Sequence, residues 1–338
     1  MIRQADRRTL SPDMSLTAFY DAYVHPIHRI AKDADPKTIA LDRTALGHWR
    51  EITGDPPLNE IDEYVTAEFV AGLKTKPGRR GQSMARSTIA KHCIHAQFVL
   101  DRAGPRSRRM RNAARLIDEP PGIEKPRQSN AMRLPLTLEQ LQAWIESSSN
   151  ATSPRLPGVD PVAWWRALIL FGYNTALRID CMMRLEWSMV GEDNWLTVPP
   201  EIFKGHEHGG LFFLNQAARD AIKPLRDAGH DRIFPFRNWP SSSSWLQEQR
   251  RRQWGRADID QPGCGFHALR RSSLTWLAGK NELVARLVAG HVAGGDMLAG
   301  HYVDRKQVVS ELLEQLPQPG GLQDDYCKAP HAPPEVSK

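Results

Sequence analysis

Apolar residues recur at spacings of three and four along most of the chain, which is the periodicity of amphipathic helices. In the first third, four stretches carry this pattern, at residues 15–34, 36–54, 59–76 and 84–104. Gly54 and Gly104 end two of these stretches as helix stops, and the Pro56-Pro57 pair prevents continuation of the helix that stops at Gly54. The pattern predicts an N-terminal all-α domain over residues 1–105.

Capping signals mark helices in the second half. Thr137-Leu-Glu-Gln140 is a capping box, which predicts a helix from Leu138 to about Ser147. Asp160-Pro161 supplies an N-cap followed by proline at the first helical position, and it opens the apolar stretch VAWWRALILFGYNTAL. Here Trp164 and Trp165 are expected in the core.

A short β region interrupts the helices. It consists of NWLTVPP and, after the turn-rich KGHEHGG, of GLFFLN. From Gln216 onward helices dominate again and end in RKQVVSELLEQL. We therefore expect a mainly α fold with a small antiparallel β-sheet, whose second domain covers residues 137–316.

A basic strip separates the two periodic regions. Between Arg102 and Arg133 the chain holds nine Lys or Arg against three acidic residues, a net charge of +6, which equals the net charge of all 338 residues. The strip is also rich in proline, which breaks helices. It predicts a basic linker over residues 106–136, with a merely solvated linker as the alternative. The polar, Pro/Gly-rich residues 317–338 are expected to be disordered.

Composition excludes some classes of protein. No stretch approaches the ~18 apolar residues that a membrane span needs, and the N-terminus lacks the apolar region of a secretory signal. The four cysteines (Cys93, Cys181, Cys264 and Cys327) lie far apart, which argues against a disulfide framework or a zinc ribbon and fits a reducing cytoplasm.

Four separated features carry the candidate chemistry: Arg178 in TALRI, Lys204 before GLFFLN, His267-Ala-Leu-Arg270, and Gly290-His291 followed by His301-Tyr302. In this order they resemble the tyrosine recombinase (phage integrase) family, whose catalytic domain carries Arg, Lys, His-x-x-Arg, Gly-His and a C-terminal Tyr. The resemblance covers about residues 137–316, and the N-terminal helical domain is similar to the family's SAM-like core-binding domain. It implies a site-specific recombinase or integrase that cuts and rejoins DNA through a covalent 3′-phosphotyrosine, in the cytoplasm at the nucleoid.

The chemistry of strand exchange agrees with this resemblance. Rejoining DNA without ATP requires that the phosphodiester energy be kept, and a tyrosine–phosphate bond keeps it. By resemblance Tyr302 is the nucleophile, Arg178 and Arg270 bind the non-bridging oxygens, and Lys204 protonates the departing 5′ oxygen. His267 and His291 would hydrogen-bond the phosphate and assist proton movement. No cofactor and no metal is implied.

Two positions depart from the family pattern. Three residues after the first arginine the family usually has an acidic residue, but this chain has Cys181, with Asp180 one place earlier. Either Asp180 substitutes or the active site has weaker support. The interval from His291 to Tyr302, 302 − 291 = 11 positions, is also slightly longer than is common.

Other interpretations stay open at this point. The implied partner is double-stranded DNA, bound by a homotetramer on paired sites, with room for accessory DNA-bending or directionality proteins and no membrane. Phosphate contacts are assigned to Arg106, Arg108, Arg109 and Arg111. A catalytically inactive DNA-binding relative and a type IB topoisomerase are the alternative functions. His206-Glu-His208 and His92-Cys93-Ile94-His95 invite a metal site, but neither has the H-x-x-x-H helical spacing of zinc hydrolases.

Overall fold

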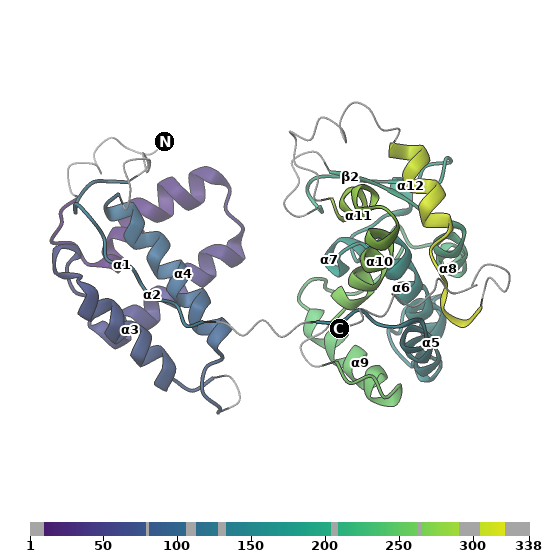
Figure 1. Cartoon of the computed structure of the whole chain (residues 1–338), viewed down its shortest axis with the longest axis horizontal. Coiled ribbons are helices and arrows are strands. Elements are labelled where there is room, and N and C mark those ends of the chain that lie inside the picture. The colour runs from purple at the N-terminus through teal and green to yellow at the C-terminus, as the bar shows by residue number, and fades with distance from the viewer. Residues whose placement is uncertain are drawn as a thin grey trace, which may run out of the picture. The chain divides into compact units, whose positions relative to one another are not determined.

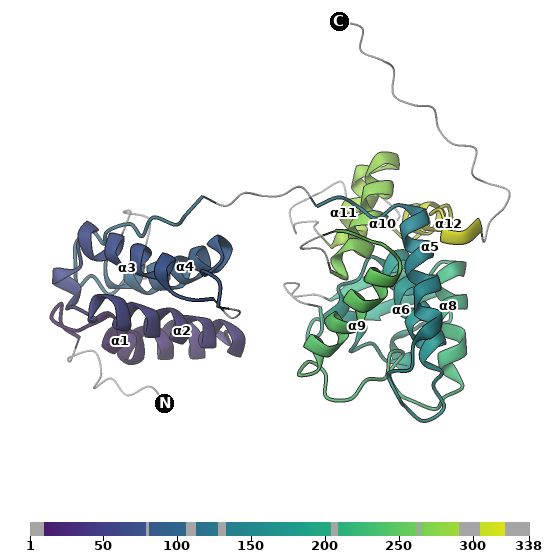
Figure 2. The same ribbon diagram turned by 90° about the horizontal axis from the view of Figure 1, so that it is seen from below.

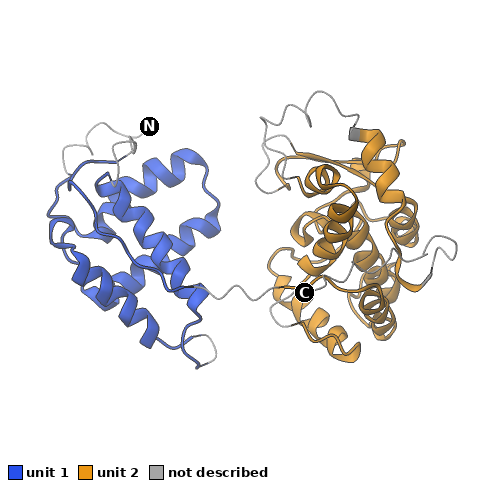
Figure 3. Cartoon of the chain, in the orientation of Figure 1, with its two compact units in different colours: residues 1–131 blue, residues 132–338 orange. Residues whose placement is uncertain are grey.

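The computed structural model (Figure 1) describes residues 10–78, 81–105, 113–127, 133–203, 209–261, 265–290 and 305–321. The chain divides into two compact units, Met1–Ala131 and Met132–Lys338, which Figure 3 shows in different colours. Both units are mostly helical, and a small antiparallel sheet lies in the second. Among the helices that the structure describes, none combines the length and the apolar character of a membrane span.

Unit 1 is built from helices in two layers. Its elements are α1 (Leu16–Phe19), the π-helical segment Tyr20–Arg29, the 3-10 turn Ile30–Lys32, α2 (Pro36–Thr53), the 3-10 turn Leu58–Glu60, α3 (Glu63–Thr75) and α4 (Arg86–Ala103). Figure 2 shows α1 and α2 on one side and α3 and α4 on the other. Apolar side chains fill the space between the layers, and Trp49 of α2 lies 5.1 Å from Phe69 of α3, ring centroid to ring centroid.

The first predicted helix, over residues 15–34, is not a single α-helix. Pro26 has no N–H to donate to the carbonyl four residues earlier, and the backbone around it takes the wider π-helical turn from Tyr20 to Arg29. Gly54 is confirmed as a left-handed helix stop, with φ of 75°. Gly104 acts differently, because its backbone is extended and a Cβ there would collide with the Ile117 carbonyl. Close approach of the following chain explains this glycine.

The residues expected to form a linker pack onto both units. In unit 1, the Ala114 amide donates to the Arg102 carbonyl (2.7 Å), and Ile123 is buried in the core. In unit 2, Leu136 is buried, and its amide donates to the Ser272 hydroxyl (2.8 Å). The buried apolar side chains explain this packing, which charge and proline content alone do not reveal.

Unit 2 has a central helix surrounded by others. Its elements are α5 (Leu138–Ser147), the 3-10 turn Ser148–Asn150, α6 (Pro161–Thr175), α7 (Ile179–Met182), the 3-10 turn Trp187–Met189, β1 (Trp195–Val198), β2 (Gly210–Phe213), α8 (Gln216–Arg226), α9 (Ser243–Arg256), α10 (His267–Lys280), α11 (Glu282–Ala289), α12 (Arg305–Glu314) and the 3-10 turn Pro319–Gly321. α8 and α10 pack on α6 (Figures 1 and 2). Trp164 and Trp165 of α6 are buried as expected.

Local capping predicted the starts of two of these helices correctly. Thr137 and Gln140 form the reciprocal capping box that opens α5. Asp160 accepts two amides at the start of α6, where Pro161 is the first residue. The two strands pair antiparallel in the register Trp195 with Phe213. This confirms the small antiparallel sheet.

Candidate active site

The first arginine of the expected phosphate clamp lies at a helix junction. α6 ends at Thr175, and Ala176 turns the backbone with φ of 53°. The Thr175 hydroxyl donates to the Phe171 carbonyl (2.7 Å) and accepts the Leu177 amide (3.4 Å). Arg178 then occupies the N-cap position of α7 in an extended conformation, with a half-buried side chain. The end of the buried helix α6 therefore sets the position of Arg178.

The second arginine, Arg270 of α10, is held by backbone carbonyls. Its side chain is only 6% exposed, and its Nη1 and Nη2 each donate a hydrogen bond of 2.7 Å, to the carbonyls of Ala176 and Ala289. Ala176 follows α6, two residues before Arg178, and Ala289 is the last residue of α11. The guanidinium thus joins the ends of two helices next to the first arginine.

The charges of the two arginines act on each other and on His267. Burial, followed by the charge of Arg178, lowers the pKa of Arg270 to about 10. Although the His267 side chain is exposed, desolvation by the protein atoms around its ring lowers its pKa, and so do the charges of Arg270 and Arg178. Within the described residues, no carboxylate forms a salt bridge with Arg270. A buried cation without an acidic partner favours binding of an anion.

Asp180 and Cys181, two and three residues after Arg178, show which groups the local acidic side chain contacts. Asp180 forms an ion pair with Arg184 (Nη2 to Oδ2, 3.2 Å) and accepts the indole N–H of Trp239 (3.1 Å). Cys181 is buried, and burial, followed by the Asp180 charge, raises its thiol pKa to about 12. The thiol is therefore neutral beside two arginines, and the Asp180 carboxylate is bonded elsewhere.

Three of the six expected site residues, Arg178, His267 and Arg270, are brought together by the structure. Lys204, His291 and Tyr302 lie outside the described residues, as do Arg106, Arg108, Arg109 and Arg111. The segments beside them are described. Phe203 is buried at the end of the chain that leaves β1, and Gly290 closes α11 in the left-handed conformation, with φ of 63°.

α12 packs on the hairpin and on α11. Lys306 in its first turn pairs with Asp193 (Nζ to Oδ2, 2.8 Å) and lies 5.5 Å from the ring centroid of Trp195. Val309 and Leu313 join a small apolar cluster with residues of β1, β2, α10 and α11. The helix that follows the Tyr302 position in sequence is therefore fixed to the same framework as the arginines.

The motif at His92 and His95 forms no metal site with other described residues. The Nδ1 atom of His95 lies 2.6 Å from Oδ1 of Asp42, which Arg29 also binds, and the ring of His92 lies edge-on to His48. The described part of the chain holds no group of three metal-ligating side chains. His206 and His208 are outside it.

Sequence reasoning missed a buried polar cluster at the end of α6, four residues before Arg178. Asn174, in the last turn of α6, bonds with Asn215 and Gln318, and all three side chains are nearly inaccessible. The available signal was the polar residue inside the apolar stretch LILFGYNTAL, since a buried amide needs hydrogen-bond partners. The partners themselves, 41 and 144 positions away, have no such signal.

Comparisons with known proteins place the fold. No protein-family model and no curated protein matches the sequence. Among solved structures, the chain is similar to a lambda integrase tetramer bound to a Holliday junction, with a TM-score of 0.61, 16% identity, and coverage of 90% of this chain and 81% of that one. The chain has the fold of the tyrosine recombinases.

Two further structures support that statement. The Tn1549 transposon integrase in complex with circular intermediate DNA gives a TM-score of 0.58 at 13% identity, over 87% of this chain and 98% of that one. The XerH site-specific recombinase bound to a palindromic difH substrate gives 0.56 at 17% identity, over 88% and 84%. These similarities extend over most of both chains, so the fold predicted from the motif order is confirmed.

Proposed function

We propose that this protein is a tyrosine-type site-specific DNA recombinase. The observation that carries the proposal is the buried Arg270, which forms no salt bridge with a carboxylate of the described residues. Arg270 acts electrostatically together with Arg178 on His267. In the tyrosine recombinase fold, such a cluster suits the scissile phosphate of DNA. The pentacoordinate transition state bears extra negative charge, which two guanidinium groups stabilise more strongly than they stabilise the ground state.

The proposed reaction conserves bonds and protons at each step. The Tyr302 hydroxyl releases its proton to solvent, with His291 assisting, as its oxygen attacks phosphorus and forms a 3′-phosphotyrosine. The bond to the 5′ oxygen breaks, and Lys204 supplies the proton to that oxygen. The lowered pKa of His267 leaves its ring neutral at pH 7, so it can donate one hydrogen bond to a phosphate oxygen. Attack by a 5′ hydroxyl reverses the step, and His291 assists proton movement.

DNA binding is assigned to both units. In this proposal residues 1–105 form the core-binding domain and residues 106–136 connect it to the catalytic domain. Residues 137–316 form the catalytic domain, and residues 317–338 follow it. Arg106, Arg108, Arg109 and Arg111 would lie along phosphates. Four copies would act on two paired sites, in the nucleoid, with accessory DNA-bending or directionality proteins where the reaction needs them.

Trapping the covalent intermediate tests the proposal. A binding site is first selected from random duplex DNA and then nicked near the cleavage position, so that the cut strand end diffuses away. With EDTA present, the wild-type protein should form an adduct that survives a denaturing gel, and mass spectrometry should place the DNA on the Tyr302 peptide. Tyr302→Phe should bind the same DNA and form no adduct.

The alternative functions give different results in the same assay. A catalytically inactive relative binds its selected site and never yields an adduct. A topoisomerase of type IB relaxes supercoiled plasmid that lacks the selected site, whereas a recombinase exchanges strands only between two copies of the site. Loss of the adduct on addition of EDTA would contradict the metal-free scheme.

A further inference from the structure

Three buried amide side chains meet at the last turn of α6, and each of their N–H groups donates a hydrogen bond. Asn174 ends α6, Asn215 caps α8, and Gln318 follows α12, with exposures of 1%, 2% and 8%. The Nδ2 of Asn174 donates to Oε1 of Gln318 (3.0 Å) and to the Leu170 carbonyl (2.9 Å). Its Oδ1 accepts from Gln318 (2.8 Å) and from Asn215 (2.7 Å).

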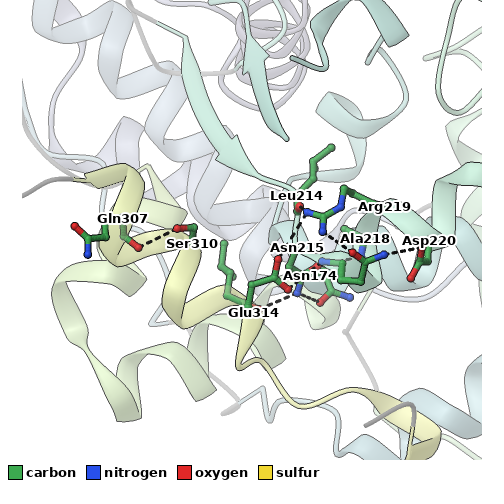
Figure 4. Close-up of polar contacts among 11 residues, drawn as sticks. Asn174, Leu214, Asn215, Ala218, Arg219, Asp220, Gln307, Ser310 and Glu314 are labelled. Atoms are coloured by element: carbon green, nitrogen blue, oxygen red, sulfur yellow. Dashed lines mark hydrogen bonds and ion pairs between the residues drawn. The ribbon is translucent and has the colours of Figure 1, made fainter. Parts of the chain in front are cut away.

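The remaining side-chain N–H groups of Asn215 and Gln318 donate to backbone carbonyls. Asn215 donates to the Leu313 carbonyl (2.8 Å) and accepts the Ala218 amide (3.0 Å). Gln318 donates to the Leu316 carbonyl (2.7 Å). Figure 4 shows Asn174 and Asn215 meeting where α6, α8 and α12 converge. Since every donor has a partner, the cluster can exist in one arrangement and loses several bonds together when one member is removed.

Further contacts fix the same stretch of chain after α12. The Tyr173 hydroxyl donates to the Pro317 carbonyl (2.9 Å), and the Glu314 carboxylate accepts the Gln216 amide (3.1 Å) at the start of α8. Leu316 is completely buried. The segment Leu313–Gln318 is therefore docked on its own unit by these polar contacts and by the buried side chains of Leu313 and Leu316. Pro317 and Gln318, expected from the sequence to begin a disordered tail, are held in place because their polar groups bond to α6.

The cluster holds the end of α6, just before two residues of the candidate active site. Asn174 is two residues before Ala176, whose carbonyl holds Arg270, and four residues before Arg178. We propose that Asn174, Asn215 and Gln318 are positioning residues, which hold the end of α6 so that Ala176 and Arg178 keep the geometry of a phosphate site. Undocking of the segment around Gln318 then loosens both arginines at once. The consequence for catalysis rests on the proposed function.

The test compares variants of the full-length protein that break the cluster with one that weakens α6 elsewhere. Gln318→Ala removes the amide, and Gln318→Met removes it while keeping the length of the side chain. The matched control is Asp160→Ala, which removes the N-cap at the opposite end of the same helix. If Gln318→Ala does not fold, judged by circular dichroism, Gln318→Asn takes its place.

Two readouts follow the arginines without DNA. The affinity for inorganic phosphate, measured by calorimetry, should fall at least threefold in both Gln318 variants and stay within twofold of wild type in Asp160→Ala. The NMR titration of His267, assigned with a His267→Gln variant, should move toward the ordinary histidine pKa only when the cluster is broken, because the arginine charges then lie less close.

The outcomes separate positioning from simple stabilisation. If the Gln318 variants unfold more easily but match Asp160→Ala in both readouts, the cluster is only structural and the proposal is overturned. Wild-type behaviour of Gln318→Met would overturn it too, since packing would then suffice. If phosphate does not bind even the wild type, the His267 titration alone decides. Neither readout needs strand cleavage, so absence of a covalent adduct would refute the proposed function and leave this coupling standing.

Discussion

Acidification should destabilise unit 1 through two buried histidines. His28 and His92 are each 6% exposed, and burial, followed by nearby positive charges, lowers the pKa of each ring from 6.5 to about 4. Among the described residues, no hydrogen-bond partner meets either nitrogen of His28 or the Nδ1 of His92. Protonation therefore places a charge in surroundings that do not compensate it.

Proton linkage gives the direction and the size of the change in the free energy of unfolding with pH. Between pH 6.5 and pH 4 the unfolded chain binds more protons at these residues than the folded chain does, so stability falls as the pH falls. Moving from pH 7 to pH 5 costs about 2 kcal/mol for each histidine, and about 4 kcal/mol for both. Below pH 4 the loss levels off at about 3 kcal/mol for each histidine. The two rings have different neighbours, so the costs should add.

The assay must report on unit 1 within the whole chain. Amide hydrogen exchange of peptides from α2 and α4, followed across urea concentrations, gives the free energy of unfolding of this unit at pH 7 and at pH 5. The variant with both His28→Leu and His92→Leu should lose about 4 kcal/mol less than wild type over this interval. His230→Leu in unit 2 is the control, and it should leave the pH dependence of unit 1 unchanged. A wild-type loss below about 1 kcal/mol, or an equal loss in the double variant, would refute the reasoning.

Three further results are expected. Arg270→Met should keep unit 2 folded, since it removes a buried charge along with two hydrogen bonds, while adduct formation falls at least ~100-fold in the nicked-DNA assay. The Cys181 thiol, buried and with its pKa raised to about 12, should react with iodoacetamide at pH 8 at least ~100-fold more slowly than a free thiol, as followed by peptide mass mapping. Glutamine at Arg106, Arg108, Arg109 and Arg111 should weaken DNA binding and make the binding constant depend less steeply on salt concentration. An unchanged salt dependence would indicate a solvated linker.

Local chemistry explains which elements could be predicted from the sequence. The capping box at Thr137 and the Asp160-Pro161 pair act within one helical turn, so their sequence signal is complete. Gly104 was assigned to the correct helix end for the wrong reason, because the collision partner of its missing side chain, Ile117, lies in a later segment. The π-helical turn around Pro26 was missed because helical periodicity does not distinguish it from an α-helix.

In the candidate site, too, some residues could be predicted from the sequence and others could not. The order of the motifs led to Arg178, His267 and Arg270, and the structure brings these three together. The groups that hold Arg270 were invisible, because backbone carbonyls exist at every residue and leave no mark on the sequence. The amide cluster was hidden for another reason, since Asn174 and Gln318 meet across 144 positions. Sequence patterns identify side chains with unusual chemistry, whereas their supports come from the tertiary fold.

The way Arg270 is held explains how a buried cation can persist without a carboxylate among the described residues. Ala176 and Ala289 stand at the C-terminal ends of α6 and α11, where helix carbonyls lack partners within the helix. Each helix end carries a partial negative charge of about half a unit, so two converging ends offset roughly one positive charge. A carboxylate in that place would occupy the arginine and repel a phosphate, whereas carbonyl dipoles stabilise the guanidinium and leave no full negative charge to compete. The Cys181 thiol is neutral, so it adds no negative charge near Arg178 and Arg270. The positive charge of Arg270 is therefore not neutralised by a carboxylate of the described residues, which suits a site for phosphate.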